Sequence, residues 1–160
     1  MLRELIALED HSKVWIYQAD RELAYDEIDE IRPEIYQYVD QWTSHHKSVM
    51  GYGNIFHRRF IALFVDESMA ATSGCSIDSS VAFIRSQGQK FGLDFFDRLS
   101  FAYLEDDNVQ SIKTADLSIA MKDGTISDQT LFFDNLVKTK GDFMRSWLKP
   151  LKDSWHFRFV

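Results

Sequence analysis

The stretch Phe60-Ile61-Ala62-Leu63-Phe64-Val65 decides the fold of this chain. Six apolar residues in a row, with a charged residue at each end (Arg59 and Asp66), are typical of a strand that is buried on both faces of a sheet. The run is far shorter than the roughly 20 apolar residues that a membrane-spanning helix needs. We therefore expect a buried strand here, with other elements packed on both of its sides.

The segments before and after this strand carry alternating strand and helix patterns. β-Branched and aromatic residues predict strands over residues 14–19 and 99–104, and the polar-aromatic residues 48–59 are consistent with an edge strand. Apolar residues at three- and four-residue steps predict helices over residues 28–42 and 77–91, with Pro33 either kinking the first or dividing it into two short helices. The resulting order, β-α-β-β-α-β, is that of a ferredoxin-like fold.

The last third of the chain predicts a smaller set of elements. Its patterns indicate a helix over residues 115–122, a strand over 130–137, a helix over 142–148 and an alternating edge strand over 155–159. We expect a single α+β domain over residues 1–160. It would have a ferredoxin-like core over about residues 12–105 and a C-terminal α/β extension over about residues 106–160. Both long helices should cover one face of an antiparallel-rich sheet.

Composition limits the classes of function. The chain has 18 basic and 25 acidic residues and a net charge of −7, which opposes non-specific nucleic-acid binding. Its single cysteine excludes an intramolecular disulfide and argues against a secreted scaffold. The N-terminal apolar stretch at residues 5–8 is too short for a signal peptide. We expect a cytoplasmic protein with no membrane insertion and no nucleic-acid partner.

The common catalytic and cofactor motifs are missing from the sequence. No Gly-Lys dipeptide occurs, so there is no P-loop to hold nucleotide phosphates. Gly51 and Gly53 lack the third glycine of a dinucleotide-binding loop and are expected in a turn or a bulge. The five histidines show no spacing typical of a metal site. We expect no cofactor and no metal.

Cys75 and Asp78 form the most reactive local pattern. In Ser73-Gly74-Cys75-Ser76-Ile77-Asp78 the thiol is placed at the start of the second long helix, with Asp78 three residues later, as in a capping box. Amides at a helix N-terminus stabilise a thiolate, which favours a catalytic role, whereas the Asp78 carboxylate opposes it. The alternative is that Cys75 is a packed or capping residue.

Three further residues complete a candidate site. His156 and Arg158 would share one side of the terminal strand, opposite Trp155, Phe157 and Phe159 on the core side, and His11 precedes the first strand. We predict that Cys75, Asp78 and His156, as candidate catalytic residues, line one cleft with His11 and Arg158, as candidate ligands of a small anion. The alternative is that each residue has a local structural role, with Cys75 and Asp78 alone as the remaining pair.

Several segments resemble a known family. They are Asp10-His11-Ser12 with residues 14–19 and Arg21, Gly74–Asp78 with Ser80-Val81, and Trp155-His156 with Arg158-Phe159. On these residues, which extend over nearly the whole chain, the sequence resembles a family of small bacterial proteins often labelled as ABC transporter ATPases or transporter-like proteins. That label implies a P-loop, which this sequence does not contain, so the resemblance transfers no catalytic residue.

Taken together, these patterns favour a non-enzymatic binding or assembly domain with a small polar pocket near Cys75. Its expected partners are a small anionic ligand and a protein partner or a second copy of the chain. The alternative is a thiol-dependent enzyme or redox sensor that uses Cys75.

Overall fold

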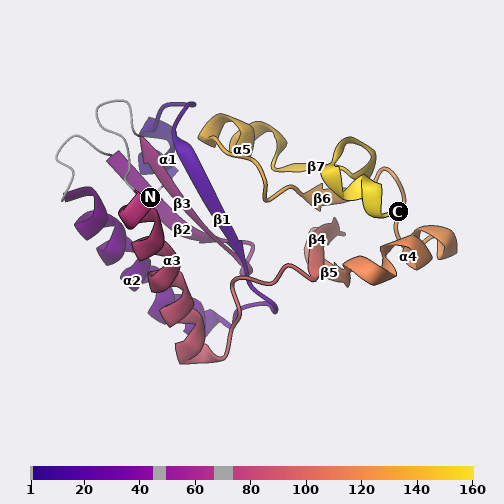
Figure 1. Ribbon diagram of the computed structural model, residues 1–160, viewed down its shortest axis with the longest axis horizontal. Coiled ribbons are helices and arrows are strands. Elements are labelled where there is room, and N and C mark those ends of the chain that lie inside the picture. Colours follow the sequence, from indigo (N-terminus) through magenta and orange to yellow (C-terminus); the bar gives the residue numbers. More distant parts are fainter. Residues whose placement is uncertain (1, 45–49, 67–73) are drawn as a thin grey trace.

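The structure is a computed structural model that describes residues 2–44, 50–66 and 74–160, and it has a mixed α/β architecture with two antiparallel sheets (Figure 1). Its elements are, in chain order, α1 (Leu2–Ala7), β1 (Lys13–Gln18), α2 (Tyr25–Ser44), β2 (Met50–Phe56), β3 (Phe60–Asp66), α3 (Gly74–Phe91), β4 (Ser100–Glu105), β5 (Asn108–Lys113), η1 (Thr114–Asp116), α4 (Leu117–Asp123), β6 (Leu131–Phe133), α5 (Lys140–Ser146), β7 (Leu148–Pro150), η2 (Leu151–Asp153) and η3 (Trp155–Phe159).

Strand β3 is the centre of the first sheet, whose order is β1-β3-β2. Residues 60–65 have no exposed surface, as the apolar run predicts. Because side chains alternate along a strand, Ile61, Leu63 and Val65 pack on one side in a core that includes residues of α2 and α3. Residues 60, 62 and 64 pack on the other side, against α1, α5 and the second sheet. Both faces of β3 are therefore covered.

Helices α2 and α3 both lie on one face of the first sheet, as Figure 1 shows. Helix α2 is one continuous helix through Pro33. Gly51 and Gly53 lie inside β2 rather than in a turn or a bulge. A Cβ atom at Gly53 would lie 2.8 Å from Ile35 and 3.0 Å from Val39 of α2. The glycine thus allows the helix to approach the strand closely.

The fourth strand of the expected ferredoxin-like sheet does not join the first sheet. Strand β4 instead belongs to the second sheet, whose order is β5-β4-β6-β7. The segment that directly follows α3 meets the end of β1, where the Asp20 N–H donates to the Asp94 carbonyl (2.9 Å) and an isolated bridge joins Gln18 to Phe96. The Asp94 N–H donates in turn to the Asp20 carboxylate (3.0 Å), which holds the chain there before it leaves for β4.

The terminal segment is a 3₁₀ helix, η3, and the expected edge strand over residues 155–159 is wrong. With three residues per turn, positions 156 and 159 share one face, and both rings contact Phe101. His156 is therefore buried (2% exposed), whereas Phe157 is 44% exposed. The Phe157 N–H donates to the Ser154 carbonyl (3.0 Å) and closes this turn.

Other C-terminal elements are shorter than, or shifted from, their sequence patterns. Strand β6 covers three residues of the expected 130–137, because the chain turns at Asp134, whose carbonyl accepts from the Val137 N–H (3.3 Å). Helix α4 ends at Gly124, which has a φ of 83°, as expected of a helix-ending glycine.

None of the helices in the described ranges is long and apolar enough to cross a membrane.

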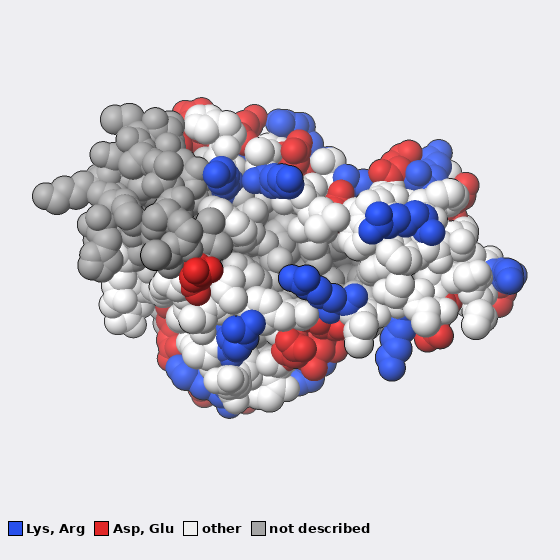
Figure 2. Space-filling model, in the orientation of Figure 1, with Lys and Arg blue, Asp and Glu red and all other residues white. Residues whose placement is uncertain are grey.

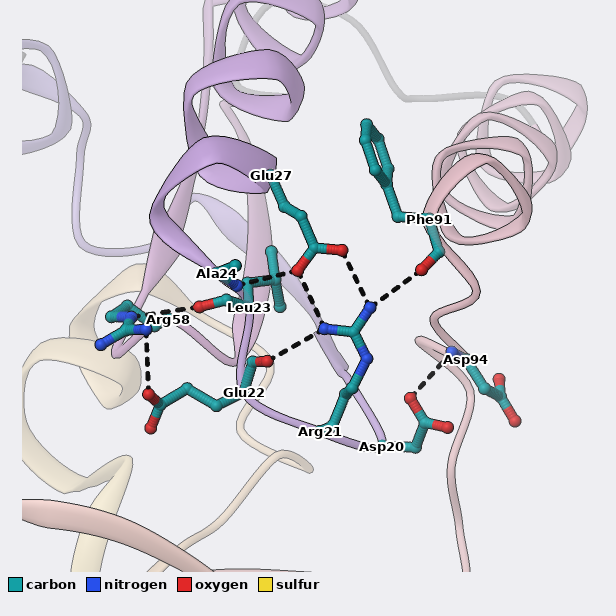
Figure 3. A network of polar contacts seen from close by, with 9 residues as sticks. All are labelled: Asp20, Arg21, Glu22, Leu23, Ala24, Glu27, Arg58, Phe91 and Asp94. Atoms are coloured by element: carbon teal, nitrogen blue, oxygen red, sulfur yellow. Dashed lines mark hydrogen bonds and ion pairs between the residues drawn. The ribbon is translucent and has the colours of Figure 1, made fainter.

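A network around Arg21 joins the start of α2 to the end of α3 (Figure 3). The Arg21 guanidinium donates to both carboxylate oxygens of Glu27 (2.9 and 2.8 Å) and to the carbonyl of Phe91 (2.8 Å). Glu27 also accepts from the Ala24 N–H (2.8 Å) at the first turn of α2. The hydrogen bonds from Arg21 lower the pKa of Glu27 to about 2.

We predict that Glu27→Gln lowers the free energy of unfolding by about 1–2 kcal/mol at pH 7, because it removes the charge from a bidentate ion pair that is partly exposed. The folded-state pKa of Glu27 lies below its ordinary value of 4.5. The contribution of the ionised Glu27 to stability is therefore complete above pH 4.5 and is lost as the pH falls towards 2. The difference in unfolding free energy between wild type and variant should shrink over that range. Urea unfolding at several pH values measures this difference in unfolding free energy.

Glu30→Gln is the matched control, because Glu30 is exposed on the same helix. Its stability should match that of the wild type at every pH. A Glu27→Gln variant that is as stable as the wild type at pH 7 would contradict the role of this network.

Candidate functional site: a cleft beside β1

A cleft of about 630 Å³ opens between the two sheets. It is lined by the second half of β1, by Val81 and Arg85 of α3, by residues 95–98, by the start of β4, by residues 135–136 and by the start of η3. Figure 2 shows the hollow in the middle of the face, with Lys and Arg side chains around it. The cleft thus lies along the edge of β1 that faces away from β3.

The backbone of Ile16 faces this cleft. Val14 donates its N–H to the Lys138 carbonyl (3.0 Å), so that N–H points away from β3. Backbone groups of alternate residues point to the same side of an antiparallel strand, which turns the N–H and C=O of Ile16 away from β3 as well. Ile16 lines the cleft, and no backbone hydrogen bond from the described residues reaches these two groups.

A chain of amide hydrogen bonds crosses the cleft. Trp147 Nε1 donates to Asn135 Oδ1 (2.9 Å), Asn135 Nδ2 donates to Gln18 Oε1 (3.0 Å), and Gln18 Nε2 donates to the Ser100 carbonyl (3.2 Å). An indole nitrogen only donates, so Trp147 fixes the orientation of both amides. We call these four residues the amide relay. It connects β1 of the first sheet to β4 of the second.

The charged residues of the cleft are mostly cationic. Arg85 and Arg98 line it together with one carboxylate, Asp97. Arg85 lies over the Phe96 ring, 4.8 Å from its centroid, whereas the exposed Arg98 has no hydrogen-bond or ion-pair partner within the ranges described. The buried Arg59 lies near enough to Asp97 to interact with it electrostatically. The positive charge here contrasts with the net charge of −7 of the chain.

Aromatic rings supply much of the remaining lining. The His156 ring stacks on Trp155, with 4.1 Å between the ring centroids, and packs against Phe101 at 4.5 Å. Its Nδ1 atom lies 2.5 Å from the Ser154 hydroxyl. Burial among these rings lowers the pKa of His156 to about 4. His156 is therefore neutral at physiological pH.

Of the five residues predicted to share a cleft, His156 lines it and Arg158 does not. The Arg158 guanidinium lies over the Trp155 ring, 5.6 Å from its centroid. His11 precedes β1 at the strand's other end, where its Nε2 atom lies 3.3 Å from the Asp66 carboxylate. Neither His11 nor the exposed Asp78 is a lining residue of the cleft.

The predicted thiol site lies partly outside the described structure. Cys75 belongs to the first turn of α3, but its side chain lies outside the described residues, so a role for the thiol stays a prediction. No group of three or more potential metal ligands is found among the residues described.

Sequence patterns did not reveal the residues that define the cleft. Gln18 and Asn135 lie 117 residues apart, and no sequence spacing relates them. One signal was visible in the sequence: Gln18 is the single polar residue in the apolar segment 14–19, and the structure buries it. Ile16 contributes backbone groups, which residue type does not reveal.

Comparison with known proteins adds no relative. No protein-family model, no curated protein and no solved structure matches the chain.

We predict that Asn135→Asp lowers the free energy of unfolding by about 1–3 kcal/mol. Aspartate still accepts from Trp147 but cannot donate to Gln18, so two oxygens face each other at Gln18 whichever way its amide turns. Urea unfolding measures the loss. Asn108→Asp, at an exposed turn where the side chain donates to Asp106, is the matched control and should cost much less. Equal effects of the two substitutions would contradict the relay.

We also predict that His156 makes stability fall in mild acid. Its folded-state pKa of about 4 lies below the ordinary value of 6.5, so the unfolded chain binds the proton first. The stability that depends on neutral His156 is complete above pH 6.5 and is lost progressively as the pH falls to about 4. His156→Phe should flatten the stability profile between pH 7 and 5. An NMR titration that places the His156 pKa near 6.5 would show this prediction to be wrong.

Proposed function

We propose that this chain is a binding domain whose cleft beside β1 takes a small, flat, negatively charged molecule. The observation that carries the proposal is the cleft itself, which joins aromatic walls to guanidinium groups on an otherwise acidic protein. The size is suitable, because ligand pockets commonly have volumes of about 300–1,000 Å³ and mostly apolar linings with a few polar groups.

The charges support an anionic ligand. Arg98 has no ion-pair partner in the described part of the chain, so a ligand carboxylate would not have to displace one. Arg85 already lies over Phe96, which places a second guanidinium beside an aromatic wall. The single carboxylate, Asp97, accepts the Leu99 N–H (2.9 Å) in a local turn. Two guanidiniums and one carboxylate leave the lining with a net positive charge.

The fold supports a binding site at this position. We propose that β1, α2, β2, β3 and α3 are an incomplete ferredoxin-like core, in which the place of a fourth strand beside β1 is occupied by the cleft. Edge strands expose unpaired backbone groups, which natural proteins usually cover. Here a ligand would cover part of that edge.

A thiol-dependent reaction at Cys75 is the alternative that the sequence predicts. Asp78 is exposed, and His11 lies beside Asp66, so neither side chain shares a site with His156. We therefore favour binding over catalysis. The cytoplasmic location and a protein partner or second copy of the chain stay predictions from the sequence.

We predict that naphthalene-1-carboxylate binds the purified protein and that Arg98→Ala weakens this binding about 5- to 10-fold, because one partly screened charge contact is lost. Naphthalene-1-methanol, which has the same rings without the charge, should bind more weakly than the carboxylate. Raising the salt concentration should narrow the difference in affinity between the carboxylate and the alcohol. Isothermal titration calorimetry measures all three effects.

Arg145→Ala is the matched control, because Arg145 is an exposed arginine that pairs with Asp10 away from the cleft (3.1 Å). It should leave binding unchanged. Equal losses from Arg98→Ala and Arg145→Ala, or no binding of the carboxylate at all, would contradict the proposed site.

A further inference from the structure

We propose that the ligand of this cleft presents an adjacent hydrogen-bond donor and acceptor, as in a ring lactam, to the backbone N–H and C=O of Ile16. This inference rests on the proposed function and specifies the chemical class of the ligand: a flat heterocyclic acid with an amide edge.

One end of the edge is closed by the segment before α5. The Val14 N–H donates to the Lys138 carbonyl (3.0 Å), the Lys140 N–H donates to the Ser12 carbonyl (2.7 Å), and a bridge joins Lys13 to Thr139. Continued pairing would place residue 136 opposite Ile16. The chain turns away instead, because the Leu136 N–H donates to the Asp134 carboxylate (3.0 Å).

The other end is closed by the segment after α3. A bridge joins Gln18 to Phe96, and the Asp20 N–H donates to the Asp94 carbonyl (2.9 Å). The open part of the edge is therefore the peptide groups of Ile16, between Val14 and Gln18, a span of roughly 13 Å at 3.3 Å per residue. An extended peptide strand would collide with the chain at both ends. A ligand with a single amide edge fits this gap.

The chemistry of the gap selects the ligand. A residue that faces outward from a strand offers one N–H and one C=O side by side, and a partner satisfies both with one acceptor and one donor. A ligand that covers these groups without bonding to them would leave them unpaired and away from water. A site of this kind discriminates strongly against an analogue that lacks the matching polar groups.

The residues around Ile16 reinforce this selection. The Gln18 and Asn135 amides each use one N–H of their NH₂ group in the amide relay, and the second N–H has no acceptor among the described residues. Both residues line the cleft, so these N–H groups are further donors for a ligand carbonyl. The rings of Phe96 and Trp155 line the same cleft and favour a flat ligand.

The test compares two acids of nearly the same shape. The first is 2-oxo-1,2-dihydroquinoline-4-carboxylate, which has a lactam edge, and the second is naphthalene-1-carboxylate, which has none. We expect the lactam acid to bind about ten-fold more tightly by calorimetry, since two hydrogen bonds are gained. In ¹H–¹⁵N spectra the Ile16 amide should shift downfield with the lactam acid and not with the naphthalene acid.

A backbone variant isolates the Ile16 N–H. Proline is tolerated in an edge strand where the N–H faces outward, so Ile16→Pro removes this donor without removing a bond of the β1–β3 ladder. Ile16→Ala is the matched control, because it shortens the side chain and keeps the N–H. We expect Ile16→Pro to reduce the ten-fold preference, because one of the two hydrogen bonds is lost, and Ile16→Ala to retain it. If Ile16→Pro does not fold, the Ile16 amide shift in the wild type decides.

The outcomes separate the two proposals. Equal affinities for the two acids, or an Ile16 amide that does not respond to the lactam acid, would overturn the lactam inference and leave the proposed binding function standing. No binding of either acid would overturn both.

Discussion

The burial of β3 on both faces is the constraint from which the rest of the structure follows. Residues 60–65 of β3 have no exposed surface and need an apolar layer on each side, and the chain supplies one from α2 and α3 and another from α1, α5 and the second sheet. Because β3 occupies the middle of a three-stranded sheet, β1 and β2 are necessarily its edges. Each edge strand then has a row of backbone groups that need partners from elsewhere.

At β1, two separate segments of the chain supply these partners. One segment from before α5 and another from after α3 each bond to one end of the strand, and neither bonds to Ile16. The amide relay fixes the distance between the two sheets at this point, and the donor-only nitrogen of Trp147 fixes its direction. The cleft is thus a consequence of how an edge strand is covered, and the same arrangement supplies its polar groups.

The sequence predicted the elements that side-chain patterns specify. The six apolar residues from Phe60 predicted β3, and the three- and four-residue apolar steps predicted α2 and α3. The pattern failed at residues 155–159, where every second residue is aromatic but the backbone forms a 3₁₀ turn after Ser154. The cleft was beyond such patterns, because it depends on the Ile16 backbone and on side chains from distant segments. Of the predicted site residues, His156 lies in the cleft, whereas His11 and Asp78 do not line it.

The sequence separation within the amide relay also bears on how the protein folds. Gln18 and Asn135 are 117 residues apart, and Gln18 and Ser100 are 82 apart. Closing loops of this length carries a large entropic cost before any contact is gained, and contacts of this kind slow folding. The cleft therefore assembles only when both sheets are in place. A chain in which residues 135–156 have not yet folded against β1 would lack the site, so occupancy of the cleft would report that the two sheets have assembled on each other.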